Sequence, residues 1–460
     1  MIIDITAQGA VGDGKKVNTA EIQVAIDMCH EAGGGTVLIP KGNYISGTVF
    51  LKSNVLLEIA AGGVLTASGD IRDYRENVHY NRYRNEKALD RCFIYAENQE
   101  NIKITGKGEI NGNAEAFPNM GSIYRPMMLR FLRCRNIHIS EVKLYQSASW
   151  TAAFLDSSCI WVREVHIFND KNYNGDGLDF DGCAHVFVDN CSITGTDDNL
   201  CLQAGSREYP VRDVHITNCE FSSLCAAIRI GLKSIGEIQG VVISNCTMER
   251  VWREGIKIEC TEGGSITDIA VSNVVMRDVS RPLFIILNNR FETEDYGSSV
   301  ELKQMPEIGR MENLMFSGII AADSEEMKKT HFRFDDDIMG RPEFEGIRID
   351  AERNHPIRGI TMTNIRYHSV GGVKKEDIPE CYPEVLDRRL YPGVKVSENY
   401  YPDWSRAAFM DVRNVEDLYL AGIQFSCEEP DEREPYYIEG CHVLKQEIYL
   451  QKTNAKQPIM

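Results

Sequence analysis

The segment "VDNC" at residues 188–191 recurs along the chain with small changes, and its spacing decides the fold. Each copy has an aliphatic residue, a polar pair, and then Cys or Val. The other clear copies are "ISEV" (139–142), "VREV" (162–165), "ITNC" (216–219), "ISNC" (243–246) and "VSNV" (271–274). The last residues of the six copies, "VDNC" included, follow one another at steps of 23, 26, 28, 27 and 28. Short alternating runs separated by Gly, Asn and Asp are typical of strands and turns. A period of this length predicts an all-β chain whose coils stack into a right-handed parallel β-helix.

A second alignment of the repeats predicts which side chains form the core. Four segments can be laid on one another: "GLDFD" (177–181), "NLCLQ" (199–203), "AIRIG" (227–231) and "GIKIE" (255–259). Their second and fourth residues are apolar, and strand alternation sends these inward. The third and fifth residues then face outward, and they include Asp179, Arg229, Lys257 and Glu259. We expect this charged outward strip to form the floor of a binding cleft.

One helix is predicted near the N-terminus, in "NTAEIQVAIDMCHEAGGG" (18–35). Asn18 or Thr19 can serve as the N-cap, and Gly33 can end the helix. The apolar stripe between them consists of Ile22, Ile26 and Cys29. Such a helix would cover the open end of the β-helix and protect its edge strands from pairing with another chain.

The domain organisation follows from the repeats. We expect residues 1–460 to form a single β-helix domain with an N-terminal cap over about residues 1–50. Charged and aromatic stretches interrupt the repeats at about 290–312, 324–345 and 370–411, and we interpret them as long loop insertions. Insertions on one face of a repeat protein commonly build a binding wall.

Composition excludes several classes of partner. The 460 residues are 43% hydrophobic and 26% charged, which predicts a globular protein. The formal charge of −18 argues against nucleic acid and against an anionic membrane surface, because both require a basic protein surface. No apolar run approaches the length of a membrane span. The start of the chain lacks a basic segment followed by an apolar one, so we expect a cytoplasmic protein whose 14 cysteines are reduced thiols.

Three aspartates carry the candidate chemistry. Asp176 lies in "NGDGLDFDG" (174–182), and Asp197 and Asp198 lie in "GTDDN" (195–199). When the strand alignment is extended backwards, Asp176 and Asp198 occupy the same position on adjacent coils, which are roughly 4.8 Å apart. Like charges this close raise at least one pKa, so a protonated acid would stand beside ionised bases. Glycoside hydrolysis needs this division of roles.

Other interpretations of these residues stay open. Single Asp-Gly and Asp-Asn pairs are usually turns, and clustered carboxylates can also bind Ca²⁺. Trp150 could be a stacking platform for a sugar or a core aromatic, and the sequence favours neither interpretation. Cys191, Cys219 and Cys246 recur at one position of the coil, so we interpret them as small core residues without a redox role.

The chain resembles glycoside hydrolase family 28, the polygalacturonases and their relatives, which have the pectin lyase-like β-helix fold. The resemblance covers most of the chain, including "GAVGDGKKVNTAEIQVAID" near the N-terminus and "RPMMLRFLRCRNIHISEVKLYQSASWTAAF" before the aspartates. The family's Asn-x-Asp motif matches "NGD", and its Asp-Asp motif matches "TDDN". The resemblance implies that Asp197 is the general acid, that Asp176 and Asp198 activate water, and that the anomeric carbon is inverted. The estimated coil spacing, in contrast, is nearer to the carboxylate separation of retaining enzymes than to that of inverting enzymes.

Two departures from the family pattern concern the substrate. The family's Gly-His-Gly region is "SLCAAIRIG" here, with Ala226 or Cys225 at the histidine position. The family's Arg-x-Lys pair, which holds the uronate carboxylate, matches Lys257 and Glu259, so one cation has become an anion. An acidic group there would repel a uronate. Rhamnogalacturonan hydrolases of the family also lack that histidine, and Arg229 is available to supply the missing charge.

These observations predict a hydrolase that removes units from pectin-derived oligosaccharides of the galacturonan or rhamnogalacturonan type, without a cofactor or a metal. We expect Asp179, Arg229, Lys257, Glu259 and Trp150 to contact the sugar. Two alternatives remain: a Ca²⁺-dependent polysaccharide lyase on the same fold, and a non-catalytic carbohydrate-binding β-helix. The oligomeric state is not predicted.

Overall fold

The computed structural model describes residues 1–76, 82–83, 91–119, 124–289, 299–304, 306–324, 332–334, 337–339, 346–377 and 406–451. The chain divides into two compact units, which are described separately. The first comprises Met1–Leu202, Glu208–Glu220 and Phe334–Asp336, and the second comprises Gln203–Arg207, Phe221–Arg333 and Asp337–Met460. The predicted insertions at 324–345 and 370–411 lie largely outside the described residues, whereas residues 299–304 and 306–312 of the insertion at 290–312 are described.

Short strands dominate the N-terminal half of the chain. In order they are β1 (Ile2–Asp4), β2 (Asp13–Val17), β3 (Gly35–Ile39), β4 (Gly42–Ser46), β5 (Val49–Phe50), β6 (Val55–Ile59), β7 (Gly63–Ala67), β8 (Cys92–Glu97), β9 (Glu100–Thr105), β10 (Glu109–Asn111), β11 (Met127–Leu132), β12 (Arg135–Ser140), β13 (Lys143–Tyr145), β14 (Ala152–Leu155), β15 (Ser158–Arg163), β16 (His166–Phe168), β17 (Leu178–Asp181), β18 (Ala184–Asp189), β19 (Ser192–Gly195), β20 (Leu200–Ala204), β21 (Val211–Thr217) and β22 (Glu220–Ser223). Short 3-10 helices lie at η1 (Ile5–Gln8), η2 (Ile71–Asp73) and η3 (Ala114–Ala116).

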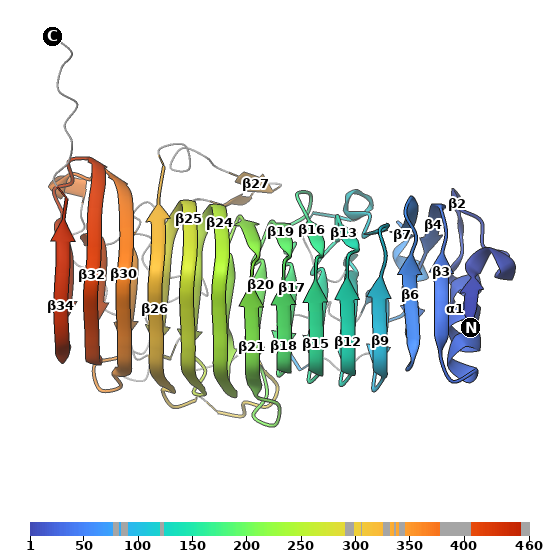
Figure 1. Ribbon diagram of the computed structural model, residues 1–460, viewed down its shortest axis with the longest axis horizontal. Helices are drawn as coiled ribbons and strands as arrows, with labels where there is room; N and C mark the ends of the chain where they lie inside the picture. Colours follow the sequence, from blue (N-terminus) through green and yellow to red (C-terminus); the bar gives the residue numbers. More distant parts are fainter. Residues whose placement is uncertain are drawn as a thin grey trace, which may run out of the picture. The chain divides into compact units, whose positions relative to one another are not determined.

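Every third strand of the first unit pairs in parallel with the next, as stacked coils require. One series runs β3, β6, β9, β12, β15, β18 and β21, and Figure 1 shows most of these strands side by side in chain order. A second series runs β4, β7, β10, β13, β16 and β19. A third runs β5, β8, β11, β14 and β17, and β17 pairs with β20. The predicted fold class, a right-handed parallel β-helix, is therefore confirmed.

Apolar ladders fill the interior as the alignment predicts. Leu178, Phe180, Leu200 and Leu202 are completely buried. Phe180 stacks on Phe154 with ring centroids 4.9 Å apart, because inward-facing residues of adjacent coils lie directly above one another. Cys191 and Cys219 are buried in the same way, in agreement with their interpretation as core residues.

The repeated asparagine has a conformational reason. Asn190 and Asn218 both adopt positive φ, 55° and 57°, at the bend between two strands of a coil. Apart from glycine, asparagine tolerates this left-handed conformation best, so each repeat can turn its corner without the strain that a branched residue would introduce. The side chain of Asn218 also donates to Asp189 on the preceding coil at 2.9 Å. The sequence period is therefore also the period of the backbone turns.

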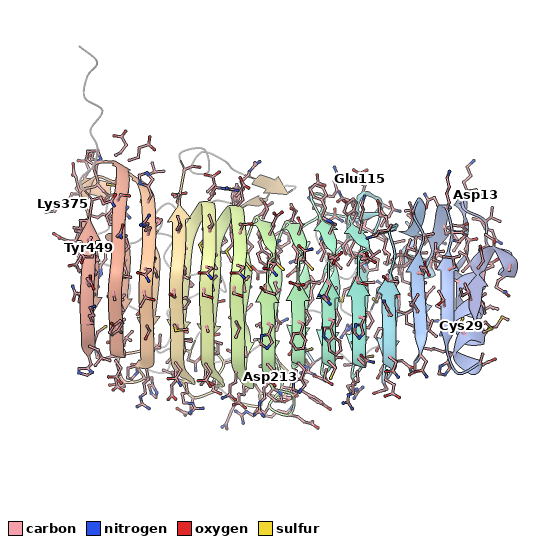
Figure 2. The ribbon with its side chains drawn as sticks, viewed as in Figure 1. Asp13, Cys29, Glu115, Asp213, Lys375 and Tyr449 are labelled. Carbon is pink, nitrogen blue, oxygen red and sulfur yellow. The ribbon has the colours of Figure 1, made fainter. Side chains whose placement is uncertain are left out.

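The predicted capping helix is present as α1 (Thr19–Glu31), with Asn18 as its N-cap residue. Ile22, Ile26 and Cys29 are completely buried, and the helix lies beside β3 at the N-terminal end of the unit (Figure 1). Figure 2 labels Cys29 on this helix. The Asn18 side chain accepts from the amide of Val11 instead of capping the helix directly.

The second unit continues the same architecture with longer strands. They are β23 (Ile228–Ser234), β24 (Glu237–Cys260), β25 (Ser265–Leu287), β26 (Arg310–Ala322), β27 (Phe332–Phe334), β28 (Asp337–Met339), β29 (Ile347–Ala351), β30 (Ile357–Gly371), β31 (Ala407–Arg413), β32 (Val415–Glu429), β33 (Glu434–Glu439) and β34 (Val443–Leu450), with a 3-10 turn at η5 (Lys375–Asp377). The alignment predicted from sequence holds, because Ile228 pairs with Ile256 and Ile230 with Ile258. No helix among the described residues is long and apolar enough to cross a bilayer.

One expectation needs correction. The strip predicted to face outward is not solvent-exposed: Asp179, Lys257 and Glu259 are at most 3% exposed. Alternation does direct these side chains away from the aliphatic core, but other charged side chains pack against them. Arg82, which is itself 1% exposed, pairs with Asp156 and lies 3.8 Å from Asp181 on the same strand as Asp179. Buried charges require such partners, so the strip is an internal polar layer.

Candidate active site

The first unit brings the three predicted catalytic aspartates together. Asp176 immediately precedes Gly177 and β17, while Asp197 and Asp198 lie in the turn between β19 and β20. The amide of Gly177 donates to the carbonyl of Asp198 at 3.1 Å, so Asp176 and Asp198 occupy the same level on adjacent coils. Backbone pairing alone therefore juxtaposes carboxylates that are 22 positions apart in the sequence.

The cluster is compact and largely buried. A carboxylate oxygen of Asp176, one of Asp198 and the thiol sulfur of Cys201 all lie within 4.8 Å of one another. Asp176 is 6% exposed and Asp198 is 2% exposed, whereas Asp197 is only partly buried. Asp197 is thus the member of the cluster that solvent, or a sugar, can reach most easily. Sequence reasoning did not include Cys201 in this site.

Hydrogen bonds hold Asp197 in one orientation. Its Oδ2 accepts from Nδ2 of Asn174 at 3.1 Å, and its Oδ1 accepts from the amide of Asp198 at 3.0 Å. The amide oxygen of Asn174 in turn accepts from Arg125 at 2.8 Å. Since the guanidinium can only donate, Arg125 fixes which end of the Asn174 amide faces Asp197.

Arg125 is a site residue that sequence reasoning missed. It is 1% exposed, and its Nη1 donates to the carbonyls of Asn119, Ala148 and Tyr173. Burial lowers the pKa of this guanidinium, and the nearby carboxylates of Asp176 and Asp197 act in the opposite direction. It therefore fastens the segment 173–174 to the neighbouring loop and places a positive charge near two acidic groups.

The electrostatics of the cluster favour a bound proton. Burial raises the pKa of Asp176 well above 3.8, and the charges of Asp197, Asp179 and Asp198 raise it further. By contrast, two donors stabilise the ionised form of Asp197. Groups this close titrate as a unit, and within that unit the surroundings of Asp176 favour its protonated form. Oδ1 of Asp176 accepts no hydrogen bond from the described residues.

The glycines of "NGDG" are required by close approach. A Cβ on Gly177 would lie 2.3 Å from the carbonyl oxygen of Asn199, and one on Gly175 would lie 2.5 Å from Oγ1 of Thr196. That hydroxyl accepts from the amide of Gly175 at 3.0 Å and donates to the carbonyl of Asn172. Each of the two glycines therefore stands where adjacent coils are in close contact, and Asp176 lies between these two contacts.

The second unit contains a separate cluster of buried charges. Nε and Nη2 of Arg229 both lie 3.1 Å from Oε2 of Glu259, and Nζ of Lys257 lies 3.7 Å from the same oxygen. Glu259 is completely buried. Its charge is compensated within the protein, so the repulsion of an anionic sugar expected from its position in the sequence is weakened.

Further members of this cluster were not predicted. Glu254 lies 3.8 Å from Lys257, 3.6 Å from Arg281 and 3.7 Å from Arg253. The ring of Phe284 lies beneath Lys257 and Arg281, 5.6 and 5.3 Å from their charged groups. Among the described residues, four cations therefore surround two carboxylates. The repeat could have revealed Arg281, because it lies 27 positions after Glu254, one coil further along.

The remaining predicted residues are less informative. Trp150 is partly buried and packs against a cluster that includes Tyr95 and Leu155, which agrees with the core interpretation without testing a stacking role. Asp179 lies in register with Ala153, and its charge contributes to the raised pKa of Asp176. Cys225 and Ala226, at the position of the family's histidine, are buried in the second unit.

Comparisons with known proteins agree with this fold. Over 391 residues the chain is 25% identical to a probable polygalacturonase from Vitis vinifera, a match covering 80% of this chain and 74% of that protein. It is 24% identical over 345 residues to an exo-poly-alpha-D-galacturonosidase from Dickeya chrysanthemi, covering 62% of this chain and 56% of that one. The structure of the family 28 exopolygalacturonase of Yersinia enterocolitica superposes with a TM-score of 0.68 at 17% identity, covering 100% of this chain and 79% of that chain.

The exopolygalacturonase of Thermotoga maritima superposes with a TM-score of 0.61 at 19% identity, covering 80% of this chain and 87% of that chain. At these identities the structures support the fold alone. The family profile described as glycosyl hydrolases family 28 matches residues 29–381, most of the chain. The protein therefore belongs to glycosyl hydrolases family 28 and is a glycoside hydrolase.

Proposed function

We propose that this protein hydrolyses pectin-derived oligosaccharides of the galacturonan or rhamnogalacturonan type, releasing units from one end of the chain with inversion of the anomeric carbon. The observation that carries the proposal is the carboxylate cluster, in which Asp176 and Asp198 are buried at one level and Asp197 is more exposed. Relatives named probable polygalacturonase and exo-poly-alpha-D-galacturonosidase support the substrate class and the exo mode.

The different burial of the carboxylates suggests their roles. Asp197 is the accessible one, so we assign to it the transfer of a proton to the glycosidic oxygen as the bond breaks. Asp176 and Asp198 then hold the attacking water and accept its proton, while the oxygen of that water bonds to the anomeric carbon. Asp197 must carry a proton before cleavage, and we assign its delivery to Asp176, whose pKa is raised, through Asp198, which has a carboxylate oxygen within 4.8 Å of one from each of the other two.

The buried cations of the second unit support an anionic substrate. Lys257 stands at the first position of the family's Arg-x-Lys pair, which by resemblance holds the uronate carboxylate, so we assign this contact to Lys257. The overall charge of −18 disfavours long polyanions, which agrees with short oligosaccharides as the substrate.

The test is incubation with defined galacturonan and rhamnogalacturonan oligosaccharides. We expect mono- or disaccharide products from the first minutes, and proton NMR should show the product anomer opposite to that of the substrate linkage. Early products of intermediate length would contradict the exo mode, and retention of configuration would contradict the assigned roles. An unsaturated product absorbing in the ultraviolet, lost on adding chelator, would indicate a lyase and overturn the proposal. Sugar binding without any product would support the non-catalytic alternative.

A further inference from the structure

The thiol of Cys201 gives the carboxylate cluster a property that glycoside hydrolysis does not require. Its sulfur lies 3.7 Å from Oδ2 of Asp198, to which it donates, and within 4.8 Å of a carboxylate oxygen of Asp176. Sulfur and two carboxylates converging on one point are a ligand set for a metal ion, and the proposed mechanism makes no use of the sulfur.

The separations suit a particular kind of cation. A tetrahedral zinc ion bound by one thiolate and one carboxylate separates the sulfur from the oxygen by roughly 3.6 Å. The observed separation of 3.7 Å between Cys201 and Asp198 is close to that value. Calcium, in contrast, requires six to eight oxygen ligands and gains little from sulfur. The donors therefore select a thiophilic cation over the calcium site considered from sequence.

A second observation points independently to a ligand. Oδ1 of Asp176 is buried and accepts no hydrogen bond from the described residues, although the side chain is only 6% exposed. Buried carboxylate oxygens are normally satisfied, so this oxygen of the cluster retains a position for a ligand. Cys201 and Asp198, each 2% exposed, enclose the same space and would shield a bound ion from water.

We propose that Asp176, Asp198 and Cys201 form an inhibitory site for a thiophilic divalent cation such as Zn²⁺ or Cd²⁺. Binding forms a metal–sulfur bond and two metal–oxygen bonds, and it releases to solvent the thiol proton and any proton shared by the two carboxylates. The cation relieves the repulsion between neighbouring aspartates. It also occupies the two carboxylates assigned to activate water, so it inhibits hydrolysis.

The site can be tested by binding measurements without any substrate. Calorimetric titration of the purified chain with Zn²⁺ should show a tight site, and Cd²⁺ should produce the ultraviolet charge-transfer absorption of a thiolate complex. In Cys201→Ala, we expect the affinity of that site to fall roughly tenfold or more and the absorption to disappear. Cys134→Ala is the matched control, because Cys134 is also 2% exposed but donates to the carbonyl of Leu132.

The outcomes separate this proposal from the proposed function. Unchanged affinity and absorption in Cys201→Ala would overturn the metal site, as would equal loss in Cys134→Ala. Cys201→Ser, which keeps the size but not the sulfur, should also lose the absorption if the variant is folded. In activity assays, Zn²⁺ should lower kcat, and each variant is compared with its own metal-free rate. Metal binding by a protein that cleaves no pectin oligosaccharide would refute only the proposed function.

Discussion

Nδ2 of Asn174 donates to Oδ2 of Asp197 at 3.1 Å, and this bond connects the two sequence motifs of the site. Asn174 belongs to "NGD" and Asp197 to "TDDN", which lie on successive coils. Arg125 determines the direction of the bond by occupying the amide oxygen of Asn174. The first motif therefore supplies both a carboxylate, Asp176, and the group that orients the carboxylate of the second.

Asp197→Asn should lower kcat by about 10²–10⁴-fold on natural oligosaccharides, because the variant cannot transfer a proton to the leaving oxygen. The free energy of unfolding should change little, since an amide can still accept from Asn174. With a dinitrophenyl glycoside, whose leaving group needs no proton, much of the activity should remain. Equal loss on both substrates would contradict the role of Asp197 as the acid, and a variant that retains full activity would refute its participation.

Asp176→Asn should stabilise the protein at neutral pH. Since the pKa of Asp176 is raised in the folded state, the folded chain keeps a proton that the unfolded chain releases, and the free energy of unfolding falls as pH rises above about 4. The asparagine variant lacks this dependence. In urea denaturation, the free energy of unfolding of the variant should exceed that of the wild type by an amount that grows between pH 4 and pH 7. Each unit by which the fold raises the pKa of Asp176 corresponds to about 1.4 kcal/mol.

The reference for that measurement is the wild-type chain, unfolded in urea over the same pH range. A pH-independent effect of Asp176→Asn would show that the carboxyl is not kept protonated by the fold.

Gly177→Ala should destabilise the protein by about 1–3 kcal/mol, because the new Cβ would overlap the carbonyl of Asn199 on the next coil. The displacement would also move Asp176, so kcat should fall more than stability alone explains. Thermal denaturation and kinetics well below Tm measure the two effects separately. Gly33→Asn, at a positive φ with no atom near the new side chain, should leave both nearly unchanged.

Lys257→Met should raise KM for galacturonan oligosaccharides by roughly tenfold, since the variant lacks the cation that we assign to the uronate carboxylate. Fully methyl-esterified oligosaccharides carry no carboxylate, and their KM should hardly change. Glu254 and Glu259 keep arginine partners in this variant, so it should fold. A similar change in KM for both substrates would indicate that Lys257 acts through packing on Phe284.

The sequence by itself determined how the strands and turns of each coil are arranged. The spacing of the repeats, the alternation of Leu178 and Phe180, and the asparagines at the corners are local properties of each repeat. Stacking repeats in register necessarily brings Asp176 level with Asp198. This is why the fold and the grouping of the three aspartates could be predicted without knowledge of any contact.

Only the tertiary structure decided what surrounds those aspartates. Arg125 reaches Asn174 from 49 positions away, Cys201 faces Asp198, and Arg229 compensates the charge of Glu259. A repeat specifies the level at which a residue lies, but burial and charge pairing depend on the lengths and directions of side chains from other coils. The free energy of a buried charge is set by those partners, so the sequence alone could not reveal whether Glu259 repels a substrate or is already neutralised.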